Sequence, residues 1–363
     1  MSLADQIADW RNGLISNPKF QSWAARNPLT RGVARRKAGA AFDLVAGFVY
    51  SQVLSATVES GLLETARTAP VTAADFAARS GLPEDGALRL LRAAAALDLL
   101  RVRTDGRFGL GEAGAALLGN PSVFAMIRHH KAFYRDLADP LALLQARSPE
   151  TELSRFWAYE TSTSAEDAAA YSALMAETQA LIAQNVLAAY DFRRHRTVMD
   201  VGGGLGAFLT AVGTAHDRPS LVLVDLPPVA RLAEARLSAS PLWPRFRIEP
   251  RDMLNDPLPP GADLITLIRV VHDHDDGPVR QLLASIRKAL APGGKLLIAE
   301  PMAGVPGAGA MADAYFGFYL WAMGRGIPRR PRELQQLLQD AGFRQVRQLK
   351  TAQPLLVSAI VAC

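Results

Sequence analysis

The chain has 363 residues, 49% of them hydrophobic, and a formal net charge of +5. It is long enough for two domains with full hydrophobic cores. Its single cysteine is the last residue, Cys363, which excludes an intramolecular disulfide and a cysteine metal cluster. The first residues lack the basic and then apolar pattern of a signal peptide, so we expect a cytoplasmic protein.

The first 37 residues carry seven basic side chains against Asp5 and Asp9, and the stretch from Trp10 to Lys37 also holds tryptophans. Such a segment suits contact with an anionic membrane or nucleic acid, and equally an ordinary solvated surface. From residue 38 to residue 58 apolar side chains recur at helical spacing. Polar residues such as Asp43 and Gln52 argue against a membrane span, and we expect a long, largely buried helix that ends at Gly61.

Residues 62–119 have the pattern of a winged helix. Thr72 is placed to cap a short helix, residues 84–99 read as a second helix, and residues 101–110 read as a hairpin with a turn at Asp105-Gly106. Winged helices can bind DNA through their second helix. Here that helix is mostly alanine and leucine, which is typical of a packing surface, so we expect no nucleic acid partner.

Residues 121–190 are predicted to be helical and rich in aromatic side chains, which can line an apolar pocket or simply form core. The stretch from Met311 to Met323 has the same character. We predict a first domain over 1–190 that contributes to the substrate pocket, and a second domain over 191–363. The candidate pocket residues are Phe133, Trp157, Met175, Phe316, Tyr319 and Met323.

The second domain alternates strands with helices, which predicts an α/β doubly wound sheet with ligands at the carboxyl ends of its strands. The expected strands are Thr197–Val201, Ser220–Asp225, Arg245–Glu249, Asp263–Val271, Lys295–Glu300, Gln345–Lys350 and Leu355–Val361.

A glycine turn follows the first of these strands, in Asp200-Val201-Gly202-Gly203-Gly204. Glycine allows a tight turn and a close ligand, and Gly202-x-Gly204-x-x-Ala207 even satisfies the dinucleotide fingerprint. However, Asp200 would repel a pyrophosphate and attract a cationic amino-acid ligand. The pattern, with Asp225 at the end of the next strand, resembles the S-adenosylmethionine (SAM) site of class I methyltransferases.

Two further groups lie at the ends of neighbouring strands, where His272 follows the fourth strand and Glu300 ends the fifth. A histidine beside a carboxylate can act as a general base. Methylation of a hydroxyl needs such a base and close reactants, and no metal. The alternative is a divalent metal site in His272-Asp273-His274-Asp275-Asp276, although consecutive residues point in different directions. A third, purely structural interpretation is that Asp275 or Asp276 caps the N-terminus of the next helix.

Several motifs occur together and in order: Asp-Val-Gly-Gly-Gly, Val-Asp-Leu-Pro, Arg-Asp-Met at 251–253, Arg-Val-Val-His-Asp-His-Asp-Asp and Ala-Pro-Gly-Gly-Lys. The chain resembles the small-molecule O-methyltransferases related to caffeic acid and acetylserotonin methyltransferases. The resemblance implies a winged-helix dimerisation domain, a homodimer, SAM as cofactor with S-adenosylhomocysteine as product, His272 as base and Glu300 as its partner. It implies these cofactor-binding residues: Asp200, Gly202, Gly204, Asp225, Leu226, Asp252, Met253 and Arg269.

The sequence departs from that family twice. His274 replaces a usual tryptophan, and Pro328 stands where a second acid often brackets the base. We therefore expect a less supported base than in the plant enzymes.

The N-terminal residues resemble a narrower group within this family. Residues 20–25, 28–31, 34–36 and 42–52 are similar to the carotenoid O-methyltransferases of purple photosynthetic bacteria. Those enzymes methylate the tertiary 1-hydroxyl of hydroxyneurosporene or demethylspheroidene, so a carotenoid substrate and peripheral contact with the photosynthetic membrane are implied. Two alternatives stay open: another lipophilic acceptor (a phenol, or carbon methylation of a bacteriochlorophyll ring) and a SAM-sensing DNA-binding regulator.

Overall fold

The computed structural model describes residues 1–120, 122–146, 150–157, 179–354 and 356–363. The chain forms two compact units, Met1–Gly119 and Asn120–Cys363. The boundary therefore falls at residue 119, whereas the sequence placed it at residue 190. The physical reason is that α8 (Ser122–Asp136) and α10 (Glu152–Trp157) pack on α15 (Gly317–Met323), within the second unit.

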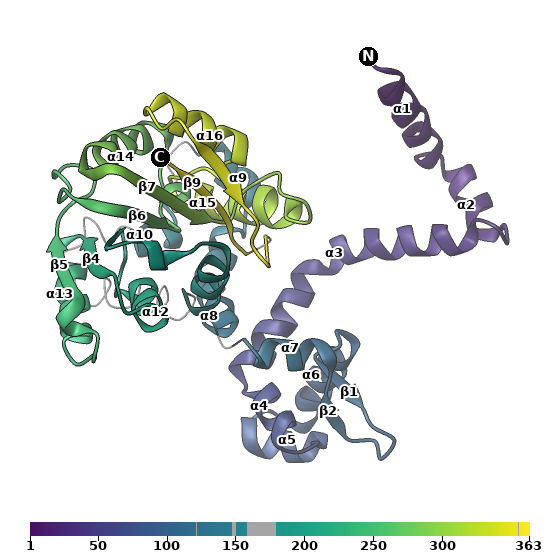
Figure 1. Ribbon diagram of the computed structural model, residues 1–363. Coiled ribbons are helices and arrows are strands. Elements are labelled where there is room, and N and C mark those ends of the chain that lie inside the picture. Colours follow the sequence, from purple (N-terminus) through teal and green to yellow (C-terminus); the bar gives the residue numbers. More distant parts are fainter. Residues whose placement is uncertain (121, 147–149, 158–178, 355) are drawn as a thin grey trace. The chain divides into compact units, whose positions relative to one another are not determined.

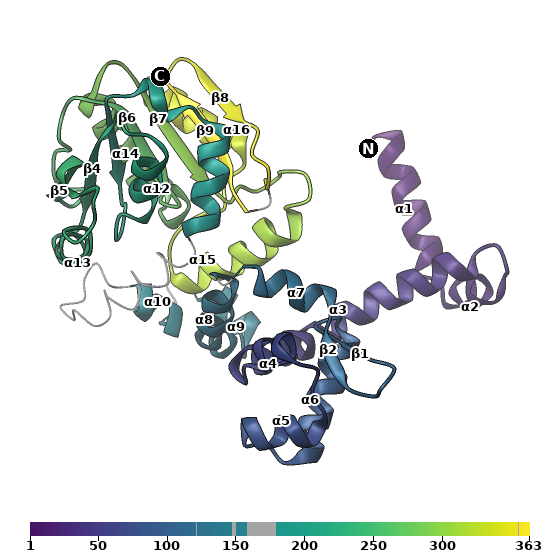
Figure 2. The ribbon, with the colours of Figure 1, turned by 60° about the horizontal axis from the view of Figure 1, so that its bottom comes forward.

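The first unit contains helices and one short hairpin (Figure 2). Its elements are α1 (Leu3–Ile15), α2 (Pro18–Arg26), α3 (Arg31–Glu59), α4 (Leu62–Thr68), α5 (Ala73–Ser80), α6 (Glu84–Ala96), β1 (Leu100–Val102), β2 (Phe108–Leu110) and α7 (Glu112–Leu118).

The winged-helix prediction is confirmed by the order α5, α6, β1, β2. Thr72 and Asp75 form a reciprocal capping box at the start of α5, in which each side chain accepts the other residue's backbone N–H. The hairpin turns at Gly106, whose φ of +77° suits glycine. Local sequence signals therefore determine this part of the fold.

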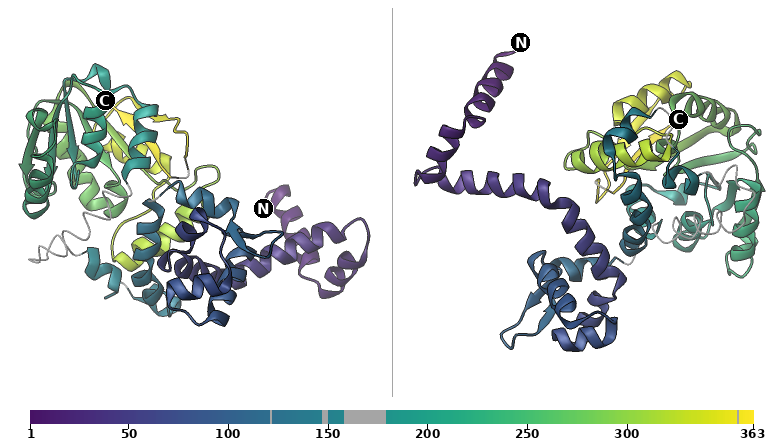
Figure 3. Two further views of the ribbon diagram at one scale, coloured as in Figure 1. Left: turned by 90° about the horizontal axis from the view of Figure 1, so that it is seen from below. Right: turned by 180° about the vertical axis from the view of Figure 1, so that it is seen from behind.

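Helix α3 corrects one expectation. It ends as predicted, before Gly61 with its φ of +65°, but it is not largely buried. Leu44 is 87% exposed and Phe48 72% exposed, and buried residues occur only near its end, at Ser55, Thr57 and Val58. Figure 3 shows α3 extending away from the winged helix, with α1 and α2 at its far end. One copy of this unit leaves that apolar face uncovered.

By length and composition alone, α3 could also cross a membrane, the one helix among the described residues for which this holds. Asp43 lies in its apolar stretch, which makes a span costly.

The second unit is built around a seven-stranded sheet. Its other elements are α9 (Pro140–Gln145), η2 (Phe192–Arg194), β3 (Thr197–Val201), α12 (Ala207–Ala215), β4 (Ser220–Asp225), α13 (Pro227–Leu237), η3 (Trp243–Arg245), β5 (Phe246–Pro250), β6 (Ala262–Ile268), η4 (Val271–Asp273), α14 (Asp276–Ala289), β7 (Leu290–Glu300), η5 (Ala310–Phe316), α16 (Pro331–Asp340), β8 (Val346–Leu349) and β9 (Ser358–Ala362).

The strand order is β5-β4-β3-β6-β7-β9-β8. Strands β3 to β7 pair in parallel, which confirms the doubly wound α/β prediction, and β6 lies beside β7. Strand β9 runs antiparallel to both β7 and β8, a feature that the sequence did not predict. The order brings the carboxyl ends of β3, β6 and β7 to one edge of the sheet.

Both faces of this sheet are covered (Figure 1). Helices α14 and α16 pack on one face through residues such as Leu282 and Leu334, and α12 and α13 pack on the other through residues such as Phe208 and Leu237. Successive residues of a strand point to opposite faces of the sheet. Met199 packs on the face covered by α14 and α16, and Val198 packs on the face covered by α12 and α13. A sheet packed on both faces is a rigid support for groups at its edge.

We expect the exposed face of α3 to be covered by a second copy of the chain in solution, because apolar patches of this size are costly in water. Replacing Val45 and Phe48, which lie one turn apart, with glutamate should convert a dimer to a monomer in light scattering. The control replaces two exposed apolar residues elsewhere, Val102 and Leu141, with glutamate and should stay dimeric. A monomeric wild-type protein at micromolar concentration would contradict this expectation.

Candidate active site

The glycine turn joins β3 to α12 around a buried carboxylate. Oδ1 of Asp200 accepts a hydrogen bond from the Thr266 hydroxyl at 2.6 Å, and Oδ2 is buried without a partner among the described residues. Burial raises the pKa of Asp200 to about 7. A Cβ at Gly203 would lie 2.8 Å from Oδ2 of Asp200, so any larger residue there would displace this carboxylate. The turn thus holds a buried acceptor that lacks a donor.

Asp225 ties the turn to the end of β4. Its Oδ2 accepts the Gly204 N–H at 2.7 Å and its Oδ1 accepts the Leu226 N–H at 2.8 Å. Gly202 and Gly204 have φ values of +71° and +57°, and a Cβ at Gly204 would meet open space. Backbone N–H groups and a carboxylate are therefore set side by side at the sheet edge.

A cavity of about 290 Å³ lies over this turn. Every residue predicted to bind the cofactor lines it: Asp200, Gly202, Gly204, Asp225, Leu226, Asp252, Met253 and Arg269. Arg269 has a φ of +60°, rare outside glycine. It directly follows β6 and comes two residues before residues 271–276, the histidine loop, which carries His272. The unpaired oxygen of Asp200 suits a cationic group in this cavity, and the open space at Gly204 leaves room for a ligand. The site therefore fits an amino-acid-bearing cofactor such as SAM better than a pyrophosphate.

His272 and Glu300 lie together at the ends of β6 and β7, as predicted, but their contact differs from the prediction. Glu300 accepts the backbone N–H of His272 at 3.0 Å, so the hydrogen bond is not to the ring. The ring's Nε2 lies 3.0 Å from Oδ1 of Asp273, and Nδ1 is buried without a partner in the described structure. Asp273 is thus the acid that orients the imidazole, and Glu300 fixes the backbone that carries it.

Both acids affect the protonation of the ring. Burial by itself would lower the pKa of His272, but Asp273 and Glu300 outweigh it and the pKa is raised. Burial raises the pKa of Glu300 itself. Burial also opposes ionisation of Asp273, yet the neighbouring His272 holds the pKa of that carboxyl below its usual range. The ring is therefore poised to accept a proton.

An aromatic cluster contains most of the predicted pocket residues. Phe133, Trp157, Tyr319 and Met323 pack together, and the Phe316 ring lies 5.8 Å from the His272 ring. Met175 falls outside the described residues.

The sequence missed the polar groups of this cluster. His129 pairs with Tyr319 at 2.7 Å, and His130 pairs with Tyr315 at 2.7 Å. Burial lowers the pKa of His129 to about 4, so that ring is neutral at pH 7. The sequence does not indicate that these two adjacent histidines of α8 bond to different tyrosines, Tyr319 and Tyr315.

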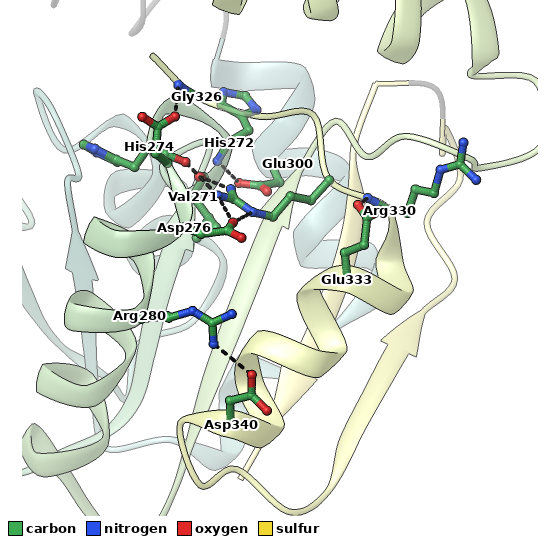
Figure 4. A network of polar contacts seen from close by, with 12 residues as sticks. Val271, His272, His274, Asp276, Arg280, Glu300, Gly326, Arg330, Glu333 and Asp340 are labelled. Carbon is green, nitrogen blue, oxygen red and sulfur yellow. Dashed lines mark hydrogen bonds and ion pairs between the residues drawn. The ribbon is translucent and has the colours of Figure 1, made fainter.

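Among the described residues no group of three or more His, Cys, Asp or Glu side chains is placed to hold a metal ion. The side chains of His272 and His274 point apart (Figure 4), and His274 lines the cavity over the glycine turn. Asp275 stands at the N-cap of α14 but accepts the Gly326 N–H at 3.1 Å instead of capping the helix with its side chain.

This sheet order, with a glycine-turn cavity at the strand ends, defines a class I methyltransferase domain, and the first unit is the winged-helix domain that precedes it. Comparison with known families agrees: an O-methyltransferase domain matches residues 134–344, and an O-methyltransferase dimerisation domain matches residues 42–120. The chain belongs to this O-methyltransferase family.

Three relatives illustrate the similarity. A demethylspheroidene O-methyltransferase of Cereibacter sphaeroides is 43% identical over 96% of this chain and 93% of its own length. The protein of the same name from Rhodobacter capsulatus is 43% identical over 93% of this chain and 85% of its own length. A solved structure of CalO1, a methyltransferase of calicheamicin biosynthesis in its S-adenosylhomocysteine-bound form, is 28% identical with a TM-score of 0.75 and covers 90% of this chain and 98% of that one.

Proposed function

We propose that this protein is a SAM-dependent O-methyltransferase that methylates the tertiary 1-hydroxyl of an acyclic hydroxycarotenoid such as demethylspheroidene. The observation that carries the proposal is the 43% identity to a demethylspheroidene O-methyltransferase over 96% of the chain. That span includes residues in front of the dimerisation domain, where the family match itself does not reach.

SAM fits the cavity over the glycine turn. Asp200, with its unpaired buried oxygen, would hold the ammonium group, and Asp225 would hold the ribose hydroxyls. Met253 and Asp252 would border the adenine. When bound, the cofactor supplies an electrophilic methyl group.

The residues of this chain provide the base. A tertiary alcohol is a very weak acid, so imidazole cannot ionise it beforehand, and the proton leaves as the oxygen is methylated. Because Nε2–H of His272 donates to Asp273, the basic lone pair is on Nδ1. Asp273 stabilises the ring when it becomes positively charged, and the apolar cluster around Phe133 and Tyr319 excludes water and suits a polyene.

The match to a dimerisation domain supports a homodimer. The N-terminal segment from Trp10 to Lys37 supports contact with lipid. A carotenoid is nearly insoluble in water, so its enzyme has to collect it from a membrane. Trp10 and Trp23 are exposed, and so are the basic residues Arg31, Arg35 and Arg36. We infer that this segment binds an anionic membrane surface peripherally from the cytoplasmic side.

The substrate is tested by methyl transfer. Incubated with labelled SAM, the wild-type protein should transfer the label to demethylspheroidene dispersed in lipid. Spheroidene, in which the 1-hydroxyl is already methylated, is the matched control and should take up none. Equal labelling of both carotenoids, or of neither, would contradict the proposed acceptor.

The base is tested by His272→Ala, which should lower turnover on the order of 100- to 10,000-fold, as removal of a general base does. Calorimetry should show normal SAM binding, because His272 acts on the hydroxyl of the substrate and not on the cofactor.

Asp225→Ala is the reciprocal variant: it should weaken SAM binding by about 2–4 kcal/mol, since hydrogen bonds to a charged carboxylate are lost. Glu300→Gln keeps an acceptor for the His272 N–H and should lose less turnover than His272→Ala. Turnover near the wild-type rate in His272→Ala would show that another group takes the proton.

Membrane contact is tested by flotation with phosphatidylglycerol vesicles, with phosphatidylcholine vesicles as control. Each basic residue near an anionic surface contributes about 1 kcal/mol, and salt screens this attraction. Binding should therefore fall with rising salt and with glutamine at positions 31, 35, 36 and 37. Absence of binding to the anionic vesicles at low salt would remove the membrane hypothesis.

A further inference from the structure

Arg329 is the buried arginine behind the histidine loop. It lies between α15 and α16, is only 2% exposed, and makes four hydrogen bonds to residues 271–276. Nη1 donates to the Val271 carbonyl at 2.9 Å and Nη2 to the His274 carbonyl at 2.8 Å. Nε and Nη2 donate to Oδ1 of Asp276 at 3.0 and 2.8 Å. Figure 4 labels three residues of the loop that accept these bonds, Val271, His274 and Asp276.

The neighbouring backbone binds the same loop. The Ile327 N–H donates to the His272 carbonyl at 2.9 Å, and Gly326 donates to the Asp275 carboxylate. Gly326 has a φ of +95°, and a Cβ there would overlap the His272 carbonyl oxygen. The carbonyl groups of Val271, His272 and His274 are therefore all bound by residues 327 and 329. On the other side of the loop, Glu300 binds the His272 N–H.

A buried guanidinium needs partners for its donors, because an unpaired buried charge is strongly destabilising. The rigid fork of arginine can serve two carbonyls and a carboxylate at once, whereas lysine presents only a point charge on a flexible stem. Asp276 is half-exposed, so its charge stays partly solvated while it balances the guanidinium. The number and direction of these bonds fit a device that fixes backbone geometry.

We propose that Arg329 is a positioning residue: it fixes the backbone of residues 271–276 so that the imidazole of His272 stays against Asp273 and faces the acceptor hydroxyl. The inference rests on the proposed function, because it requires His272 to be the base. Arg329 touches neither the base's ring nor the cofactor cavity in the described structure. It acts through the loop.

The test compares Arg329→Lys with Arg330→Lys, the same change at the adjacent exposed arginine. Misplacement of a reacting group by about 1 Å can cost on the order of 100-fold in rate. We expect Arg329→Lys to lower kcat by roughly 10- to 100-fold with little change in the KM of the acceptor, and Arg330→Lys to be normal. In a His272→Ala background Arg329→Lys should cost nothing further. An additional loss in that background would overturn the proposal.

The pH profile separates positioning from general stability. Only neutral His272 accepts a proton, so the rate should rise with pH through the pKa of His272. This rise is the limb of the pH profile. The charged groups that face the ring are Asp273, Glu300 and Arg269. When Arg329→Lys loosens the loop, contact with the two acids weakens and burial dominates, so the limb should move to lower pH. Loss of folded protein alone would reduce the amplitude and leave the limb in place, and that result would overturn the proposal.

Asp276→Asn provides a second variant in case Arg329→Lys does not fold. It weakens the two bonds from the Arg329 guanidinium to residue 276, so the loop is held less firmly. We therefore expect a limb shift in the same direction as in Arg329→Lys, but smaller, with a smaller loss of kcat. An unmoved limb in Asp276→Asn would count against the proposal. The proposed function fails separately: if the wild-type profile has no limb attributable to His272, the base itself is misassigned.

Discussion

A buried histidine held between two carboxylates is the interaction on which the site depends. Asp273 contacts the His272 ring and Glu300 binds the His272 backbone N–H. The Glu300 contact exists because β6 and β7 are parallel neighbours, so the loop after one strand meets the last residue of the other, whereas Asp273 is the next residue in that loop. The same sheet edge carries the glycine turn after β3. One pattern of strand pairing thus brings the cofactor cavity next to the proton acceptor, while both faces of the sheet are locked by helices.

The loop between β6 and α14 is fixed from two directions. Glu300 binds it from the sheet, and Arg329 and Ile327 bind it from the segment before α16. Pro328 stands in that segment, where the family resemblance implied a second acid beside the base. The structure shows a different support there: backbone hydrogen bonds that restrain the loop, with Asp273 as the acid beside the ring.

Much of this could be predicted from the sequence, where the signals are local. The bounds of β3 and β4 are those predicted, because apolar β-branched runs end sharply at Asp200-Val201 and at Asp225. The glycine turn and Asp225 were predicted because they lie at strand ends, whereas Asp252, Met253 and Arg269 were predicted from the family resemblance. Three features depend on contacts distant in sequence and could not be read from it. They are the antiparallel pairing of β9, the exposed face of α3, and the bonds from Arg329 to a loop more than fifty residues earlier.

In this site, neighbouring acids overcome burial and keep His272 able to take a proton near neutral pH. The most direct measurement is an NMR titration of its imidazole, one of six histidines, assigned by the signal lost in His272→Ala. We expect a pKa above the ordinary value of about 6.5, together with a rate of methyl transfer that rises over the same pH range. A ring that stays neutral down to about pH 5, well below that ordinary value, would show that burial prevails and would overturn the role assigned to Asp273 and Glu300.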